Sequence, residues 1–183
     1  NIGMQYATGK YINFMDSDDR WGLNAFQLSY DFLEENYDDI DCVACRIKQF
    51  ESTGKFLYLD YKFKGDRIID INENYADVQL AVVSVFIKNK VATTIEFCNL
   101  LTGEEDSRYI TEVILNKGKY GIISSAKYYY RRRKDKSNAL ETSYLDLAYY
   151  SSNLLHGMNY LLRYSVEKYG EIIPYVQFTV MCM

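Results

Sequence analysis

The stretch GKYINFMDSDD, residues 9–19, has the form of a short buried strand that ends in an acidic turn. Residues 9–15 are mostly apolar, and three of the next four residues are aspartates. Carboxylates this close repel one another unless a positive charge lies among them. Hard divalent cations such as Mg²⁺ or Mn²⁺ take such oxygen ligands, so the turn is a candidate metal site. An acidic turn that only caps the next helix explains the pattern equally well.

Strand-like and helix-like segments alternate along the rest of the chain. Helical patterns cover residues 23–36, 77–84, 107–116 and 143–169. Strand-like runs cover residues 40–47, 85–88 and 120–130, and residues 55–71 are typical of a hairpin. This alternation predicts an α/β domain with a mostly parallel central sheet flanked by helices. The acidic turn would then lie at the carboxyl edge of the sheet, where such folds bind ligands.

The last clear element is a long helix over residues 143–169, with a boundary expected near Leu140. Its predicted packing face consists of Leu147, Tyr150, Leu154, Met158, Leu161 and Ser165. Gly170 can end this helix, and Pro174 fits the first turn of another.

Charge is divided unevenly along the chain. Residues 1–106 hold 10 Lys and Arg against 19 Asp and Glu, and residues 107–183 hold 11 against 6. An acidic half that faces a basic segment suits a site for a metal and a diphosphate together. The overall acidity argues against a nucleic-acid partner. Uneven solvated charge would give the same composition.

Cysteine and histidine offer no metal site of their own. The four cysteines are irregularly spaced, and we expect buried free thiols, which fit a reducing compartment. His156, the one histidine, lies within the long helical pattern and is expected to pack there. No apolar run reaches the ~18 residues that a membrane-spanning helix requires.

Two further clusters could contribute to chemistry. Glu104, Glu105 and Asp106 precede a helix, where carboxylates either cap the helix or include a general base. The run YYYRRRK, residues 128–134, places arginines where they could bind phosphate oxygens in pairs. A solvated basic loop is the alternative for that run.

The order of these motifs resembles that of the family 2 glycosyltransferases. The string Asn1-x-Gly3, Ala7, GKYI at 9–12, then FMDSDD at 14–19 is similar to the family's central signature. SVFIK at 84–88, Phe97, the Glu-Glu-Asp, Tyr-Tyr-Arg and Ser137 follow in the family's order. The resemblance covers residues 1–140 and implies the GT-A fold and an inverting enzyme. Such chains build bacterial capsules, lipopolysaccharide and wall polymers.

The resemblance also implies roles for individual residues. Asp106 corresponds to the catalytic base, with Glu105 beside it. The implied donor-binding residues are Asp16, Asp18, Arg131, Arg133 and Ser137. The implied metal ion, Mn²⁺ or Mg²⁺, is bound by Asp18 and Asp19. The implied donor is a nucleotide sugar, a UDP-sugar above all, and the acceptor a carbohydrate or glycolipid hydroxyl. The implied location is cytoplasmic, with peripheral association at the inner face of the membrane.

The same resemblance divides the chain into a catalytic core, residues 1–140, and a C-terminal helical extension, residues 141–183. The strand–helix–strand unit with which the family grips the nucleobase lies outside this sequence, so we expect a segment of a longer protein.

Two other functions stay open at this point. One is a related metal-dependent nucleotidyl- or phosphotransferase, which product analysis across several donors would identify. The other is a non-catalytic interaction domain, which would show no metal-dependent hydrolysis of donor.

Overall fold

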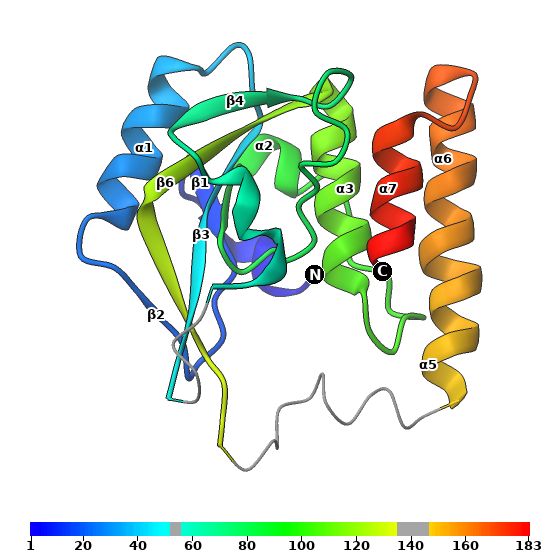
Figure 1. Ribbon diagram of the computed structural model, residues 1–183, viewed down its shortest axis with the longest axis horizontal. Helices are drawn as coiled ribbons and strands as arrows, with labels where there is room; N and C mark the ends of the chain where they lie inside the picture. Colours follow the sequence, from blue (N-terminus) through cyan, green and yellow to red (C-terminus); the bar gives the residue numbers. More distant parts are fainter. Residues whose placement is uncertain (52–55, 135–146) are drawn as a thin grey trace.

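The computed structural model describes residues 1–51, 56–134 and 147–183, which form a mixed, curled sheet flanked by helices (Figure 1). The strands are β1 (Tyr11–Asn13), β2 (Arg20–Trp21), β3 (Cys42–Phe50), β4 (Arg67–Asp70), β5 (Val85–Lys88) and β6 (Lys119–Arg131). The helices are η1 (Gly3–Tyr6), α1 (Ala25–Glu35), η2 (Tyr58–Lys62), α2 (Asn89–Ala92), α3 (Glu105–Lys117), α5 (Leu147–Ser152), η3 (Asn153–Met158), α6 (Asn159–Tyr169) and α7 (Pro174–Cys182).

The sheet has the strand order β1-β5-β3-β6-β2, and β4 pairs with β6. Among the described strands only β3 and β6 run parallel, and the other four pairings are antiparallel. The α/β class and the flanking helices are as predicted, but the mostly parallel sheet was wrong. The described part of the connection between β3 and β5 forms η2 and β4 rather than a crossover helix, and it enters β5 in the direction antiparallel to β3.

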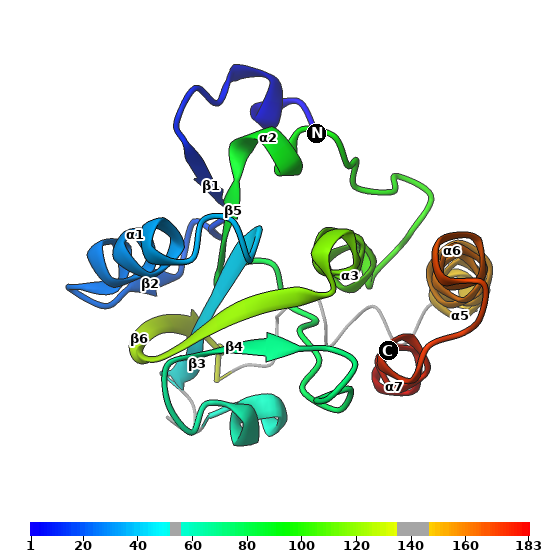
Figure 2. The ribbon, with the colours of Figure 1, turned by 90° about the horizontal axis from the view of Figure 1, so that it is seen from above.

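Apolar side chains pack on both faces of the sheet. Helix α1 covers one face through Ala25 and Leu33, which pack against Val43 and Ile123. Helix α3 covers the other face, and α7 joins the same core cluster through Tyr175 and Val176. Seen from above, α1 and α3 lie on opposite sides of the sheet, with α5, α6 and α7 beyond α3 (Figure 2). Burial on both faces explains why the first half of β3, CVAC, and most of β5 read as apolar runs, whereas the second half of β3 alternates.

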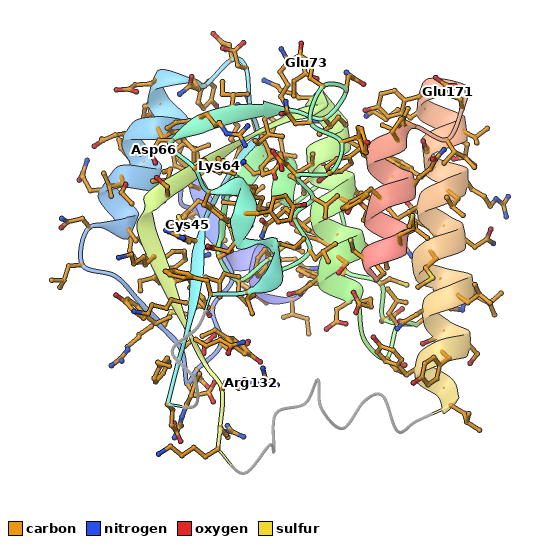
Figure 3. The ribbon with its side chains drawn as sticks, in the orientation of Figure 1. Cys45, Lys64, Asp66, Glu73, Arg132 and Glu171 are labelled. Atoms are coloured by element: carbon orange, nitrogen blue, oxygen red, sulfur yellow. The ribbon has the colours of Figure 1, made fainter. Side chains whose placement is uncertain are left out.

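Strand β6 is strongly bent, and the bend positions its last residues. The pairing of β3 with β6 shifts register after Cys45, opposite Ser124–Ala126. Asp66 lies beside this bend (Figure 3) and accepts hydrogen bonds from the main-chain N–H and hydroxyl of Ser124 at 2.7 and 2.8 Å. Beyond the bend, β6 turns towards β2 and the acidic turn.

The helices end where their sequences predict. Gly118 follows α3 with φ +69°, and Gly170 follows α6 with φ +80°, the left-handed conformation that glycine adopts without strain. Pro174 begins α7. Two local predictions were wrong: the described part of the predicted hairpin, residues 56–71, holds η2 and β4 instead, and residues 77–84 form no helix.

The packing face of the long C-terminal helix also differs from the prediction. Leu147, Tyr150 and Leu154 are 85, 56 and 59% exposed, whereas Leu161 and Ser165 are buried as expected. The buried residues upstream are Tyr149, Asn153 and Gly157, at a regular spacing of four. Residues four apart do not stay on one face of an α-helix, because a turn holds about 3.6 residues. The wider π-helical turn η3 keeps these residues on the same face. The division at residue 140 stays a prediction.

His156 lies in η3, within the C-terminal helix, as the helical pattern predicted. All four cysteines are free thiols, with Cys42 and Cys45 buried and Cys98 and Cys182 half-buried. Within the described ranges, no helix has the length and apolar content needed to cross a bilayer.

Candidate active site

The acidic turn follows β1 and is fixed to the sheet by Asn13. The Asn13 amide donates to the carbonyl oxygens of Val83 and Val85 at 3.0 and 2.9 Å. Its own oxygen accepts a hydrogen bond from Trp21 Nε1 at 3.2 Å. Asn13 thus joins the residues on both sides of the turn to the segment that enters β5.

Asp19 links the turn to the far end of β6. It is only 8% exposed, and its two oxygens accept hydrogen bonds from the Tyr128 hydroxyl at 2.6 Å and the Arg131 main-chain N–H at 2.7 Å. Burial raises the pKa of Asp19, although both hydrogen bonds act in the opposite direction. Asp19 is therefore an anchor that holds two distant segments together.

Asp18 and Asp16 lie nearer to solvent. Asp18 forms an ion pair with Arg133 at 2.9 Å, and Arg131 pairs with Glu51 at 2.5 Å. Asp16 is exposed as a residue, but partial burial of its carboxyl group and the charge of Asp18 raise its pKa. Figure 3 shows the neighbouring Arg132 at the free end of β6, at the opposite end of the molecule from Glu73 and Glu171.

Asp106 lies in the first turn of α3, at the same end of the fold. Its Oδ2 accepts a hydrogen bond from the Val82 main-chain N–H at 3.3 Å. Burial, followed by the charges of Glu105, Asp16 and Glu104, raises the pKa of Asp106 to about 7. The contribution from Asp16 places the acidic turn within electrostatic reach of Asp106. A carboxyl group with a pKa near neutrality is suited to general-base chemistry.

The structure thus gathers most of the sequence-predicted residues around one rim. Asp16, Asp18 and Asp19 lie with Arg131 and Arg133 at the end of β6, and Asp106 with Glu105 lies at the start of α3. Ser137 lies outside the described residues. Within residues 1–51, 56–134 and 147–183, no three acidic, His or Cys side chains already converge on one metal position.

Sequence reasoning missed Tyr128 and Asn13. Tyr128 joins the turn twice, because its hydroxyl also accepts the Asp16 main-chain N–H at 3.4 Å. No local pattern signals this role, since Asp19 and Tyr128 are 109 positions apart. Lys88, the last residue of the SVFIK run, forms a buried ion pair with Asp41.

Comparison with known proteins gives these residues a context. Residues 1–91 match the family model described as glycosyl transferase family 2. The match covers just under half of the 183-residue chain. The Asp-Ser-Asp-Asp turn and β5 lie inside the matched region, and Asp106 and β6 lie after it.

Two Bacillus subtilis relatives align along almost the whole chain. The minor teichoic acid biosynthesis protein GgaB is 31% identical over 182 residues, which are 99% of this chain and 20% of GgaB. The minor teichoic acid biosynthesis protein GgaA is 29% identical over 185 residues, covering 99% of this chain and 41% of GgaA. The chain thus spans well under half the length of these relatives.

Solved structures of S. aureus TarS share the fold. TarS 1–349 in complex with UDP-GlcNAc superposes with a TM-score of 0.69 at 18% identity, covering 88% of this chain and 45% of TarS. The complex with UDP gives a TM-score of 0.60 at 16% identity, covering 93% and 50%. The chain therefore has the GT-A fold that its motifs predict.

Proposed function

We propose that the protein containing this chain transfers a sugar from a nucleotide-sugar donor to an acceptor hydroxyl, with inversion, in the synthesis of a bacterial surface polysaccharide. The observation that carries the proposal is the pairing of a family 2 match with one rim that holds Asp16, Asp18 and Asp106. The teichoic acid relatives support the polymer class. The TarS complexes with UDP-GlcNAc and UDP support a UDP-sugar donor.

In the proposed reaction the Asp106 carboxylate takes the proton from the acceptor hydroxyl. The acceptor oxygen then bonds to the anomeric carbon from the face opposite the diphosphate, whose bond to the sugar breaks. Glu105 beside Asp106 helps to set its pKa near neutrality. The diphosphate leaves with the nucleoside, and Arg133 and Arg131 neutralise its charge.

The rim fits a divalent cation by the chemistry of its oxygens. No described residue donates a hydrogen bond to the Asp16 side chain, and the negative charges of Asp16 and Asp18 repel each other. We therefore assign Mn²⁺ or Mg²⁺ to Asp18, with Asp16 as the second carboxylate. Asp19 stays a predicted ligand, although Tyr128 and Arg131 already use both of its oxygens. The ion, when bound, would stabilise the departing diphosphate.

The acceptor is proposed to be a carbohydrate or glycolipid hydroxyl. A cytoplasmic location with peripheral attachment to the inner membrane face also stays a proposal, because it follows from the donor and polymer class alone.

The test uses the full-length protein. We expect Mn²⁺ to tighten UDP binding at least tenfold in calorimetry, and Asp18→Ala to remove most of that difference. Asp31→Ala, at an exposed aspartate on α1, is the matched control and should leave it unchanged. Equal UDP affinity with Mn²⁺ and with EDTA in the wild type would sink the metal assignment. Failure of every nucleotide sugar to give a transfer product would sink the proposed reaction.

A further inference from the structure

The C-terminal helix holds the loop that leads into Asp106. The Thr102 and Ser152 hydroxyls are 2.8 Å apart, and the Thr102 main-chain N–H donates to Ser152 Oγ at 3.4 Å. The Tyr149 hydroxyl donates to Glu104 Oε1 at 3.1 Å. We call Thr102, Glu104, Tyr149 and Ser152 the base-loop latch. Its four residues join segments more than forty positions apart.

The Tyr149 ring lies directly against the loop backbone. Tyr149 is 4% exposed, and a Cβ added to Gly103 would come within 2.5 Å of the ring. Contacts this close do not occur between real side chains, so the ring occupies the space that any other residue at 103 would need. The position of α5 therefore sets the path of the loop.

The latch also holds Glu104 in an unusual backbone conformation. Glu104 precedes α3 with φ +61°, the left-handed region that is unfavourable for a residue with a Cβ. Its carboxylate accepts hydrogen bonds from Ser107 Oγ at 2.6 Å and from Tyr149. These two bonds offset the backbone cost. Because Asp106 follows Glu104 by two residues, relaxation of Glu104 would turn the first helical turn and displace the Asp106 carboxylate.

A second contact fixes how α3 and the C-terminal helix lie against each other. Arg108 Nη1 donates to the main-chain oxygen of His156 at 2.9 Å, within the π-helical turn η3. A wider turn can release a main-chain oxygen from the intrahelical ladder, which makes it available to an outside donor. The Arg108 guanidinium also stacks on the Tyr160 ring at 3.4 Å. The two helices are therefore held together two residues beyond Asp106, at Arg108, as well as before it.

We propose that Tyr149 is a positioning residue for Asp106, so that the C-terminal helix determines where the base stands relative to the acceptor hydroxyl. This inference rests on the proposed sugar transfer. Tyr149 acts through Glu104 and the loop backbone, and a small displacement of a general base is costly because proton transfer requires a close approach. The expected signature is a lower kcat with donor binding unchanged.

The decisive variant is Tyr149→Phe in the full-length protein, which keeps the ring and removes the hydroxyl. We expect kcat to fall about fivefold to twentyfold, with the donor KM and the calorimetric Kd for UDP within twofold of wild type.

Tyr160→Phe is the matched control. The Tyr160 hydroxyl also joins the C-terminal helix to a glutamate of α3, Glu112, at 3.1 Å, but nearly two turns further from Asp106. We expect its kcat to stay within twofold of wild type. Gly103→Ala approaches the latch from the other side and should lower kcat at least as much as Tyr149→Phe, because its Cβ displaces the ring.

The outcomes separate the positioning role from the proposed reaction. If wild type transfers sugar and Tyr149→Phe keeps full kcat, the positioning role is refuted and the reaction stands. Equal losses in Tyr149→Phe and Tyr160→Phe would also refute it, because they would report helix docking in general. If the wild type transfers no sugar, the proposed function itself fails. Should Tyr149→Phe not fold, unchanged kcat in Gly103→Ala would refute the role instead.

Discussion

A carboxylate that is largely removed from water lies at each end of α3, and the two differ in how far neighbouring groups compensate the negative charge. At the C-terminal end, Asp41 accepts hydrogen bonds from Lys88 at 3.1 Å and from Asn116 at 2.9 Å, with Lys117 at 3.6 Å. The Asp41 side chain is only 4% exposed, and two cations compensate its charge. This end of the helix satisfies its buried charge, as a structural site must.

At the N-terminal end, Asp106 receives one main-chain hydrogen bond and stands among three other carboxylates. The helix dipole favours a negative charge there by up to ~2 kcal/mol at a partly buried position. Burial outweighs that effect and raises the pKa to about 7. The fold thus leaves the charge of Asp106, the proposed base, poorly compensated, whereas it neutralises the charge of Asp41. Poor compensation of a charge, rather than burial alone, separates a candidate catalytic group from a structural one.

The largest expected effect tests Asp106 as the base. Asp106→Asn keeps the shape of the side chain and an oxygen for the Val82 N–H, but it cannot accept a proton at neutral pH. We expect sugar transfer by the full-length enzyme to fall by about 10³-fold, within the range that general-base catalysis supplies. Product formation from radiolabelled donor measures it, with circular dichroism as the check on folding. Wild-type turnover in this variant would refute the assignment.

The next effect tests the structural end. Lys88→Met leaves Asp41 buried with only Asn116 and the more distant Lys117, and we expect it to lower the free energy of unfolding by about 3 kcal/mol. Urea denaturation measures the loss, and turnover per folded molecule at low temperature should be unchanged. Lys117→Met, at a side chain 30% exposed, is the control and should cost less than about 1 kcal/mol. A loss of turnover without a loss of stability would break the contrast between the two ends.

The smallest expected effect sharpens the contrast between Asp106 and Asp41: we expect that replacing Asp106 stabilises the fold. The folded-state pKa of about 7 lies above the ordinary value of 3.8, so the folded protein binds this proton more tightly than the unfolded chain. Asp106 therefore costs nothing below about pH 4; its cost grows between about pH 4 and pH 7 and is fully present above pH 7. We expect Asp106→Asn to raise the free energy of unfolding by on the order of 2 kcal/mol at pH 8, after a discount for partial exposure.

Thermal unfolding of Asp106→Asn at pH 8 and pH 4 tests this prediction, and the gain should disappear at the lower pH. An equal gain at both values would mean that side-chain packing, and not the ionised carboxylate, limits stability here.

Much of the fold was predictable because its signals are local. The GKYINFM strand, the helix ends at Gly118 and Gly170 and the start of α7 at Pro174 depend on residues within a few positions of one another. Strand direction was not predictable in this way. Whether β5 runs parallel or antiparallel to β3 depends on the path of the connection, and η2 with β4 replaced the crossover that the pattern suggested. The face of the C-terminal helix was missed because one π-helical turn rotates it.

By itself, the sequence determined that three carboxylates follow a buried strand, that Glu104, Glu105 and Asp106 open a helix, and that arginines follow the last strand. Only the tertiary structure decided the burial and the hydrogen-bond partners of each carboxylate. Asp19 became an anchor because Tyr128, 109 positions away, donates to it, and Asp106 acquired a pKa of about 7 because the surrounding fold removes water from it. Burial and hydrogen bonding depend on atoms that only folding brings together, so no local pattern encodes them.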